Sequence, residues 1–125
     1  MMRLLIGILS ILVTIISGCV STQKPFSMDY KTNDTVFHLS QSCIDHITPR
    51  EKENVIFIKV KNSAKCSNAF NLFWEKSVGG KVSVFFNGEV ISKDIYTVTP
   101  IHTENGFNQS VKSKTTFDKI INILN

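Results

Sequence analysis

The most reactive side chains in this 125-residue sequence belong to three cysteines and three histidines. A cysteine thiol can be acylated, can pair with a second thiol or can bind a metal. Cys43 and His46 form a C-x-x-H pattern, and Cys66 with His38 or His102 could complete a zinc site. One half-motif with irregular spacing indicates zinc only weakly, so a metal site stands as an alternative interpretation of these residues.

Cys19 ends an apolar N-terminal segment. Met1–Arg3 gives a short positive start, and Leu4–Ile16 is almost wholly apolar. A membrane-spanning helix needs about 20 apolar residues, so this segment is too short to cross a bilayer. It has the length of a signal-peptide core, and the small residues Ser17 and Gly18 follow it, as at a cleavage site.

The junction Ile16-Ser17-Gly18-Cys19 resembles the lipobox of bacterial lipoproteins. The resemblance implies a diacylglycerol on the thiol, cleavage of residues 1–18 as a signal peptide, and acylation of the new amine of Cys19. Two or more acyl chains anchor a protein stably. Lipoproteins kept at the inner membrane of enterobacteria usually carry Asp after this cysteine. Val20 stands there, which implies the outer membrane, with the domain facing the periplasm. A plain signal peptide with an incidental cysteine is the alternative.

Once Cys19 is lipidated, Cys43 and Cys66 remain as a pair. An even number of cysteines in an oxidising compartment favours a disulfide over a metal site. We therefore predict a Cys43–Cys66 disulfide and no resident metal.

The composition limits the possible functions. The formal net charge is +4, but the lysines are scattered and no dense basic run with aromatic residues occurs, so nucleic-acid binding is not indicated. The sequence holds no G-x-S-x-G, no H-E-x-x-H and no phosphate-binding loop. Glu51 and Glu53 could serve as paired catalytic carboxylates, but they lie in a charged segment that is more typical of a solvated loop. We predict a non-enzymatic protein without a cofactor.

The strands of the mature chain are indicated by alternation. Residues 19–34 are polar and predict a tether, which leaves 35–125 as the domain. Strand composition marks 35–40, and a charged loop is expected at 48–54. In the strand at 55–61, alternate residues should face the core: Ile56, Ile58 and Val60. Asn87-Gly88 lies between two β-rich runs and predicts a type I′ hairpin, with Val82, Val84 and Phe86 on one face. Extended pieces are expected at 95–101 and 107–111.

Two helices are indicated by apolar residues at helical spacing. The first is expected at 63–77, with Cys66, Ala69, Phe70, Phe73 and Trp74 as its buried stripe. Asn62 or Ser63 is its N-cap candidate, and Gly79-Gly80 ends it. The second is expected at 115–124, with Thr115 and Asp118 as a cap signature and Phe117, Ile120, Ile121 and Leu124 buried. This order predicts an α+β fold: a mostly antiparallel sheet with two helices packed on one face.

Residues 55–124 resemble the head of the first periplasmic domain of SecD and SecDF, the translocase accessory proteins. The similar stretches are "VIFIKV", "VGGKVSVFFNGEVIS", "TPIHTENGFNQSV" and "TTFDKIINIL". The resemblance implies this fold, an ability to bind emerging polypeptide and no catalytic residues. Lys93-Asp94 stands where the family has Ala-Pro, and the sequence holds no membrane-spanning translocase part, so the translocase role does not carry over.

The sequence therefore predicts a lipid-anchored, non-catalytic module that binds a protein or peptide in the periplasm. Exposed strand edges could pair with an extended partner. The candidate contact residues lie in the hairpin: Phe85, Asn87, Gly88, Glu89 and Ile91. An ordinary turn and sheet face explains the same residues equally well. The alternative function is an immunity or inhibitor lipoprotein against a toxin, a phage factor or an envelope hydrolase.

Overall fold

The strands form two antiparallel sheets that face each other across one core. The computed structural model describes residues 26–124. The larger sheet has the order β2-β1-β5-β6 and contains β1 (Ser27–Lys31), β2 (Val36–Ser40), β5 (Lys81–Phe86) and β6 (Glu89–Tyr96). The smaller sheet has the order β3-β4-β7 and contains β3 (Ile44–Arg50), β4 (Val55–Val60) and β7 (Phe107–Ser110). The helices are α1 (Ala69–Ser77) and α2 (Lys114–Leu124).

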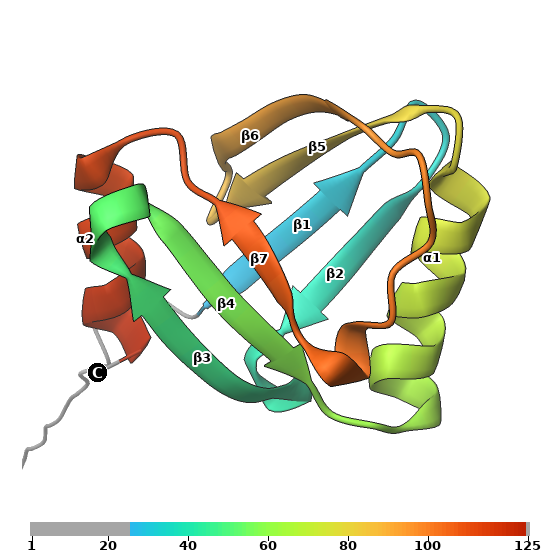
Figure 1. The fold of residues 1–125 in the computed structure, drawn as a ribbon, viewed down its shortest axis with the longest axis horizontal. Coiled ribbons are helices and arrows are strands. Elements are labelled where there is room, and N and C mark those ends of the chain that lie inside the picture. The colour runs from blue at the N-terminus through green and yellow to red at the C-terminus, as the bar shows by residue number, and fades with distance from the viewer. Residues whose placement is uncertain (1–25, 125) are drawn as a thin grey trace, which may run out of the picture.

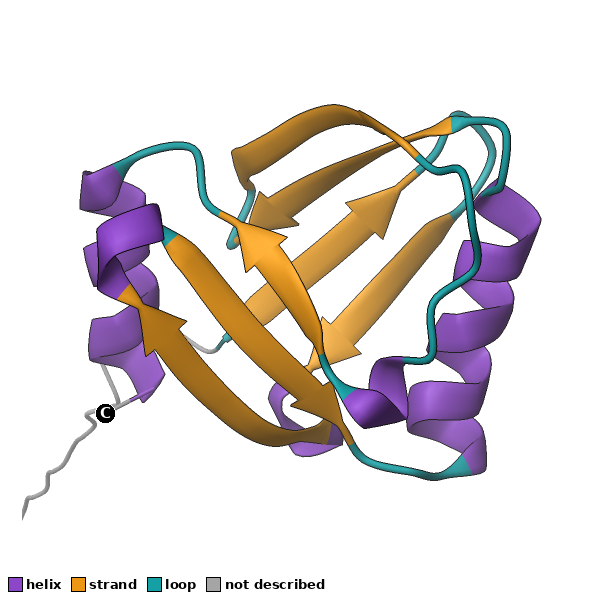
Figure 2. Ribbon diagram, in the orientation of Figure 1, coloured by secondary structure: helices purple, strands orange, loops and turns teal. Residues whose placement is uncertain are grey.

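The predicted α+β class with antiparallel strands is confirmed. The arrangement of the sheets and helices differs from the expectation in two respects. The strands form two sheets instead of one, and α1 and α2 lie at opposite ends of the molecule (Figure 1; Figure 2). Twisted antiparallel sheets bury their apolar faces by packing against each other. Here the second sheet therefore takes the place that the prediction gave to two helices on one face.

The tether predicted at residues 19–34 is wrong for its C-terminal half. Ser27–Lys31 form β1, which pairs with both β2 and β5 inside the larger sheet. Met28 and Tyr30 are fully buried, and Phe26 is nearly so. The domain thus extends at least as far back as Phe26. Alternate apolar residues in an otherwise polar segment place one face of this strand in the core.

The charged loop predicted at 48–54 is also partly wrong, because Thr48–Arg50 continue β3. Pro49 is tolerated there since β3 is an edge strand, where one side of the backbone needs no ladder partner. Only Glu51–Glu53 form a short 3₁₀ turn, and Asn54 follows with a φ of 51°.

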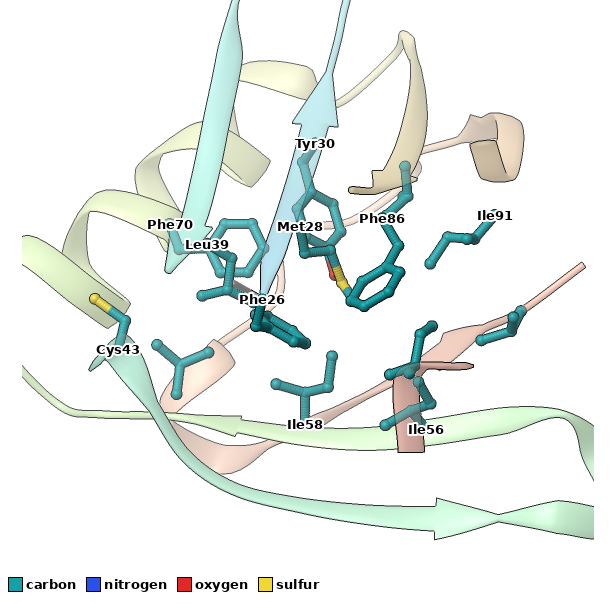
Figure 3. Packing of buried hydrophobic residues seen from close by; sticks show 14 of the residues in the cluster. Phe26, Met28, Tyr30, Leu39, Cys43, Ile56, Ile58, Phe70, Phe86 and Ile91 are labelled. Carbon is teal, nitrogen blue, oxygen red and sulfur yellow. The ribbon is translucent and has the colours of Figure 1, made fainter. Parts of the chain in front are cut away.

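The predicted alternation in β4 and β5 is confirmed. Ile56, Ile58 and Val60 of β4 are buried, as are Val82, Val84 and Phe86 of β5. Figure 3 shows Met28 and Phe86 of the larger sheet directed toward Ile56 and Ile58 of the smaller sheet. Aromatic rings extend this core toward α1, where Tyr30 packs edge-to-face on Phe70 and Trp74.

A serine caps the start of each helical segment. The predicted first helix is confirmed as a π-helical turn at Ala64–Asn68 that leads into α1, and the Ser63 hydroxyl accepts a hydrogen bond from the Cys66 amide at 3.2 Å. The cap predicted for the second helix is wrong by two residues. Ser113, not Thr115, is the N-cap, since its hydroxyl accepts from the Thr116 amide at 3.2 Å.

Candidate functional site

The sulfurs of Cys43 and Cys66 are joined in a disulfide, with the two Cα atoms 5.2 Å apart. The bond links the turn between β2 and β3 to the start of the α1 region. Neither sulfur is therefore free for a metal, and no group of three or more metal-binding side chains occurs within residues 26–124.

The three histidines lie apart from one another and have local partners. The His46 Nε2 is 2.8 Å from the Thr48 hydroxyl, His38 pairs with Asp29, and the His102 Nδ1 lies 4.0 Å from a Glu104 carboxylate oxygen.

The hairpin residues predicted as a partner surface are used by the fold itself. Asn87 and Gly88 have φ values of 49° and 86°, as a type I′ turn requires. The Asn87 side-chain oxygen accepts from the Ser27 amide at 2.9 Å, which ties the turn to the start of β1. Ile91 is fully buried because it faces the core, so it is not available to a partner.

The other two hairpin residues also have intramolecular partners. Phe85 is half-buried under the Lys31 ammonium group, which lies 4.6 Å from its ring centroid. A Glu89 carboxylate oxygen accepts from the Thr116 hydroxyl at 2.9 Å, and the Lys119 ammonium lies 3.6 Å away. The hydrogen bond first, and the nearby positive charge second, lower the pKa of Glu89 below its ordinary range. The two Glu89 contacts fasten the hairpin to α2.

The lipid-attachment candidate Cys19 lies outside the described residues. Within residues 26–124, none of the helices has the length and apolar character needed to cross a bilayer.

A groove that the sequence did not reveal lies between β6 and β7. Its cavity of about 420 Å³ falls in the range of ligand-binding pockets, and its lining includes Trp74, Ile95, Tyr96, Thr97, Val98 and Phe107. Among the described residues that line it, none is charged. Four further cavities in the described part of the chain each include charged side chains.

The two sheets meet at one end of this groove and separate at the other. The Lys112 amide donates to the Ile91 carbonyl at 2.8 Å, and the Ser92 hydroxyl donates to the Ser110 carbonyl at 3.1 Å. Beyond these bonds, β6 and β7 are edge strands of separate sheets, and the 97–106 connection runs around the open end (Figure 1).

Two buried polar atoms beside the groove have no hydrogen-bond partner among the described residues: Trp74 Nε1 and Thr97 Oγ1. Both side chains line the cavity, with exposed fractions of only 8% and 6%. Leaving a buried polar group unpaired costs about 1–3 kcal/mol, so such groups call for an explanation.

Apolar side chains are also exposed along the same rim. Ile95, Tyr96 and Val98 are 39%, 60% and 70% exposed. The extended piece predicted at 95–101 ends as a strand at Tyr96, and the rest of the run forms the rim of the groove. The sequence signal was therefore present as an apolar, β-rich run, but nothing in it showed that the outer edge of this run has no partner strand.

Comparison with protein-family models, with curated proteins and with solved structures gives no match for this chain.

Proposed function

We propose that this chain is a lipid-anchored lipoprotein of the bacterial envelope that binds another polypeptide and has no catalytic role. The observation that supports it best is the uncovered apolar rim of Ile95, Tyr96 and Val98 beside an uncharged groove. Single exposed apolar residues are ordinary on a protein surface, but a contiguous group beside a cavity is typical of an interaction site.

The position of the binding module in the cell is inferred from the N-terminal sequence. The lipobox-like junction at Cys19 supports an acyl anchor, and Val20 after it supports the outer membrane over the inner. The domain then faces the periplasm, close to proteins in transit and to proteins of the envelope. The resemblance to the head of the first SecD periplasmic domain agrees with polypeptide binding. Membership in that family stays a prediction from the sequence.

Crosslinking in intact cells tests the proposal. The lipidated protein is crosslinked, purified and analysed by mass spectrometry, with an unrelated lipoprotein of the same membrane as control. Recovery of many unfolded envelope proteins or of translocase components supports a general polypeptide-binding module. Recovery of one defined toxin, phage factor or hydrolase supports the immunity or inhibitor function instead. If the protein yields nothing beyond the control, the proposed binding function is wrong.

A further inference from the structure

We infer that the groove between β6 and β7 accepts an extended, uncharged segment of the partner polypeptide as an added β-strand. The inference rests on the proposed binding function and names its site and its ligand class. It is carried by three independent features of the groove: the free backbone edges on both sides, the uncharged lining and the two unpartnered polar atoms.

The β6 side of the groove offers unpaired backbone groups. Consecutive residues of an antiparallel strand direct their N–H and C=O groups to opposite sides. The Thr97 amide donates to the Gly80 carbonyl, and the Thr97 carbonyl accepts from the Gly79 amide. The backbone groups of Tyr96, the last residue of β6, therefore point the other way, toward the groove.

The β7 side offers the same kind of edge. The Val111 amide donates to the Asn54 carbonyl, on the β4 side, whereas the Lys112 amide donates across to Ile91. By the same alternation, Asn108 directs its backbone N–H and C=O away from β4 and into the groove. A segment lying between the two edges thus finds donors and acceptors on both sides, as in β-strand addition.

The lining determines the charge of the occupant. A charged side chain in a groove without charged neighbours would lose its hydration and gain no ion pair, which is costly. The occupant therefore presents uncharged side chains. The outer edge of β6 also changes character along its length: Lys93 and Asp94 are charged and block edge-to-edge pairing, whereas residues 95–98 are not.

The unpartnered atoms add a chemical requirement. The Trp74 indole N–H is a donor only, and it needs an acceptor such as a peptide carbonyl oxygen. The Thr97 hydroxyl can donate or accept. An extended peptide carries both kinds of group in its backbone, so it can supply partners beside both residues, which a purely hydrocarbon ligand could not.

A peptide-selection experiment tests the mode of binding. The full-length protein in detergent micelles is exposed to a phage-displayed library of random seven-residue peptides, and one selected peptide is synthesised with and without a methyl group on its central backbone nitrogen. We expect selected peptides with an uncharged, β-rich centre. N-methylation should weaken binding roughly tenfold or more, because it removes a backbone donor.

Matched variants locate the site. Val98→Glu places a charge on the groove rim and should weaken binding of the synthetic peptide at least roughly tenfold, as should Tyr96→Glu. Val36→Glu changes another exposed valine, 46% accessible on the far edge of the same sheet, and should leave binding unchanged. Circular dichroism verifies that each variant is folded. The inference would be overturned if both groove variants bound the peptide as tightly as the wild type, if N-methylation had no effect, or if no peptide were enriched.

A crosslinking experiment separates failure of this site from failure of the proposed function. A photoreactive amino acid replaces either Val98 or Val36 in the full-length protein in intact cells. An adduct from position 98 alone agrees with the groove as the binding site. An adduct from position 36 alone agrees with the binding function but excludes the groove as its site. If neither position gives an adduct and chemical crosslinking also recovers no partner, the proposed function itself is wrong.

Discussion

Gly106, immediately before β7, has little freedom to change. Its φ of 92° and ψ of 150° lie in a region open almost only to glycine, and a Cβ there would overlap the ring of Phe57 on the neighbouring strand β4. Gly106→Ala should therefore destabilise the fold by about 2–4 kcal/mol, from backbone strain and overpacking together. Denaturation followed by the fluorescence of the single tryptophan, Trp74, measures this cost.

Gly88 provides the matched control for this substitution. It also has a positive φ, 86°, but a Cβ at Gly88 meets no atom within 4 Å. Gly88→Ala should cost only the backbone strain, about 1 kcal/mol. If the two variants were equally stable, the close approach of Gly106 to Phe57 would not hold in solution.

Burial of Tyr30 makes the stability of the fold depend on pH in the alkaline range. Its hydroxyl donates to the Gln109 side-chain oxygen at 2.9 Å, and burial raises the pKa of the phenol well above its ordinary value of 10.0. Above that value the unfolded chain loses the Tyr30 proton while the folded chain keeps it, so stability falls as pH rises further. The slope from this group approaches about 1.4 kcal/mol per pH unit.

Tyr30→Phe removes both the hydrogen bond and the titrating group. Below pH 10 the variant should be less stable than the wild type by about 1–3 kcal/mol, because Gln109 loses its donor. That difference should shrink as the pH rises above about 10. Denaturation curves at several pH values measure it, with Tyr96→Phe, an exposed tyrosine, as the control. A stability difference that stays constant with pH would show that Tyr30 does not titrate on unfolding.

At the scale of elements, the disulfide joins segments that secondary structure alone leaves apart. It closes a loop with a sequence separation of 23 between the β2–β3 turn and the π-helical turn before α1. In the chain-entropy description, a loop of this size stabilises the fold by about 3 kcal/mol. Replacing both cysteines with serine should lower the free energy of unfolding by about that amount. Labelling of the Cys43 and Cys66 thiols only after reduction verifies the pairing, and labelling of either of these two residues in the untreated protein would contradict it.

The elements that could be predicted from the sequence were those whose own residues show a clear apolar alternation or a recognisable turn. Strand β4 has clear alternation, and the β5–β6 hairpin has both alternation and Asn87-Gly88 at its turn. Strand β1 also alternates, at Met28 and Tyr30, but the polar residues around it hid that pattern. Strand β3 contains Pro49 and charged neighbours, which composition assigns to a loop, although an edge strand accepts them.

The groove could not be predicted from the sequence, because it lies between two strand edges that do not pair with each other. The sequence pattern of residues 95–98 is that of an ordinary strand. Trp74 has the pattern of a core residue in a helix, and it is indeed buried, with only 8% of its surface exposed. Whether the edges of β6 and β7 meet depends on contacts between residues far apart in sequence, such as Lys112 with Ile91. Local patterns hold no information about such an edge.

At the scale of the whole molecule, strand β1 bears on the proposed membrane anchor, because it leaves few residues between Cys19 and the folded domain. An extended chain spans at most about 3.5 Å per residue. If Cys19 carries the lipid, Phe26 is thus held within roughly 25 Å of the bilayer surface. Under the proposed function, the domain would then meet its partners close to the membrane surface.

The proposed lipid anchor at Cys19 can be tested by substitution. Cys19→Ser removes the thiol that the acyl chain requires, so the protein should leave the membrane fraction or remain as the uncleaved precursor. Val20→Asp keeps the thiol and should move the protein from the outer to the inner membrane, as the resemblance to enterobacterial lipoproteins implies. Density-gradient separation of the membranes and the intact mass of the purified chain distinguish these forms. A Cys19→Ser protein that is processed normally and stays in the outer membrane would mean that another feature holds the domain there.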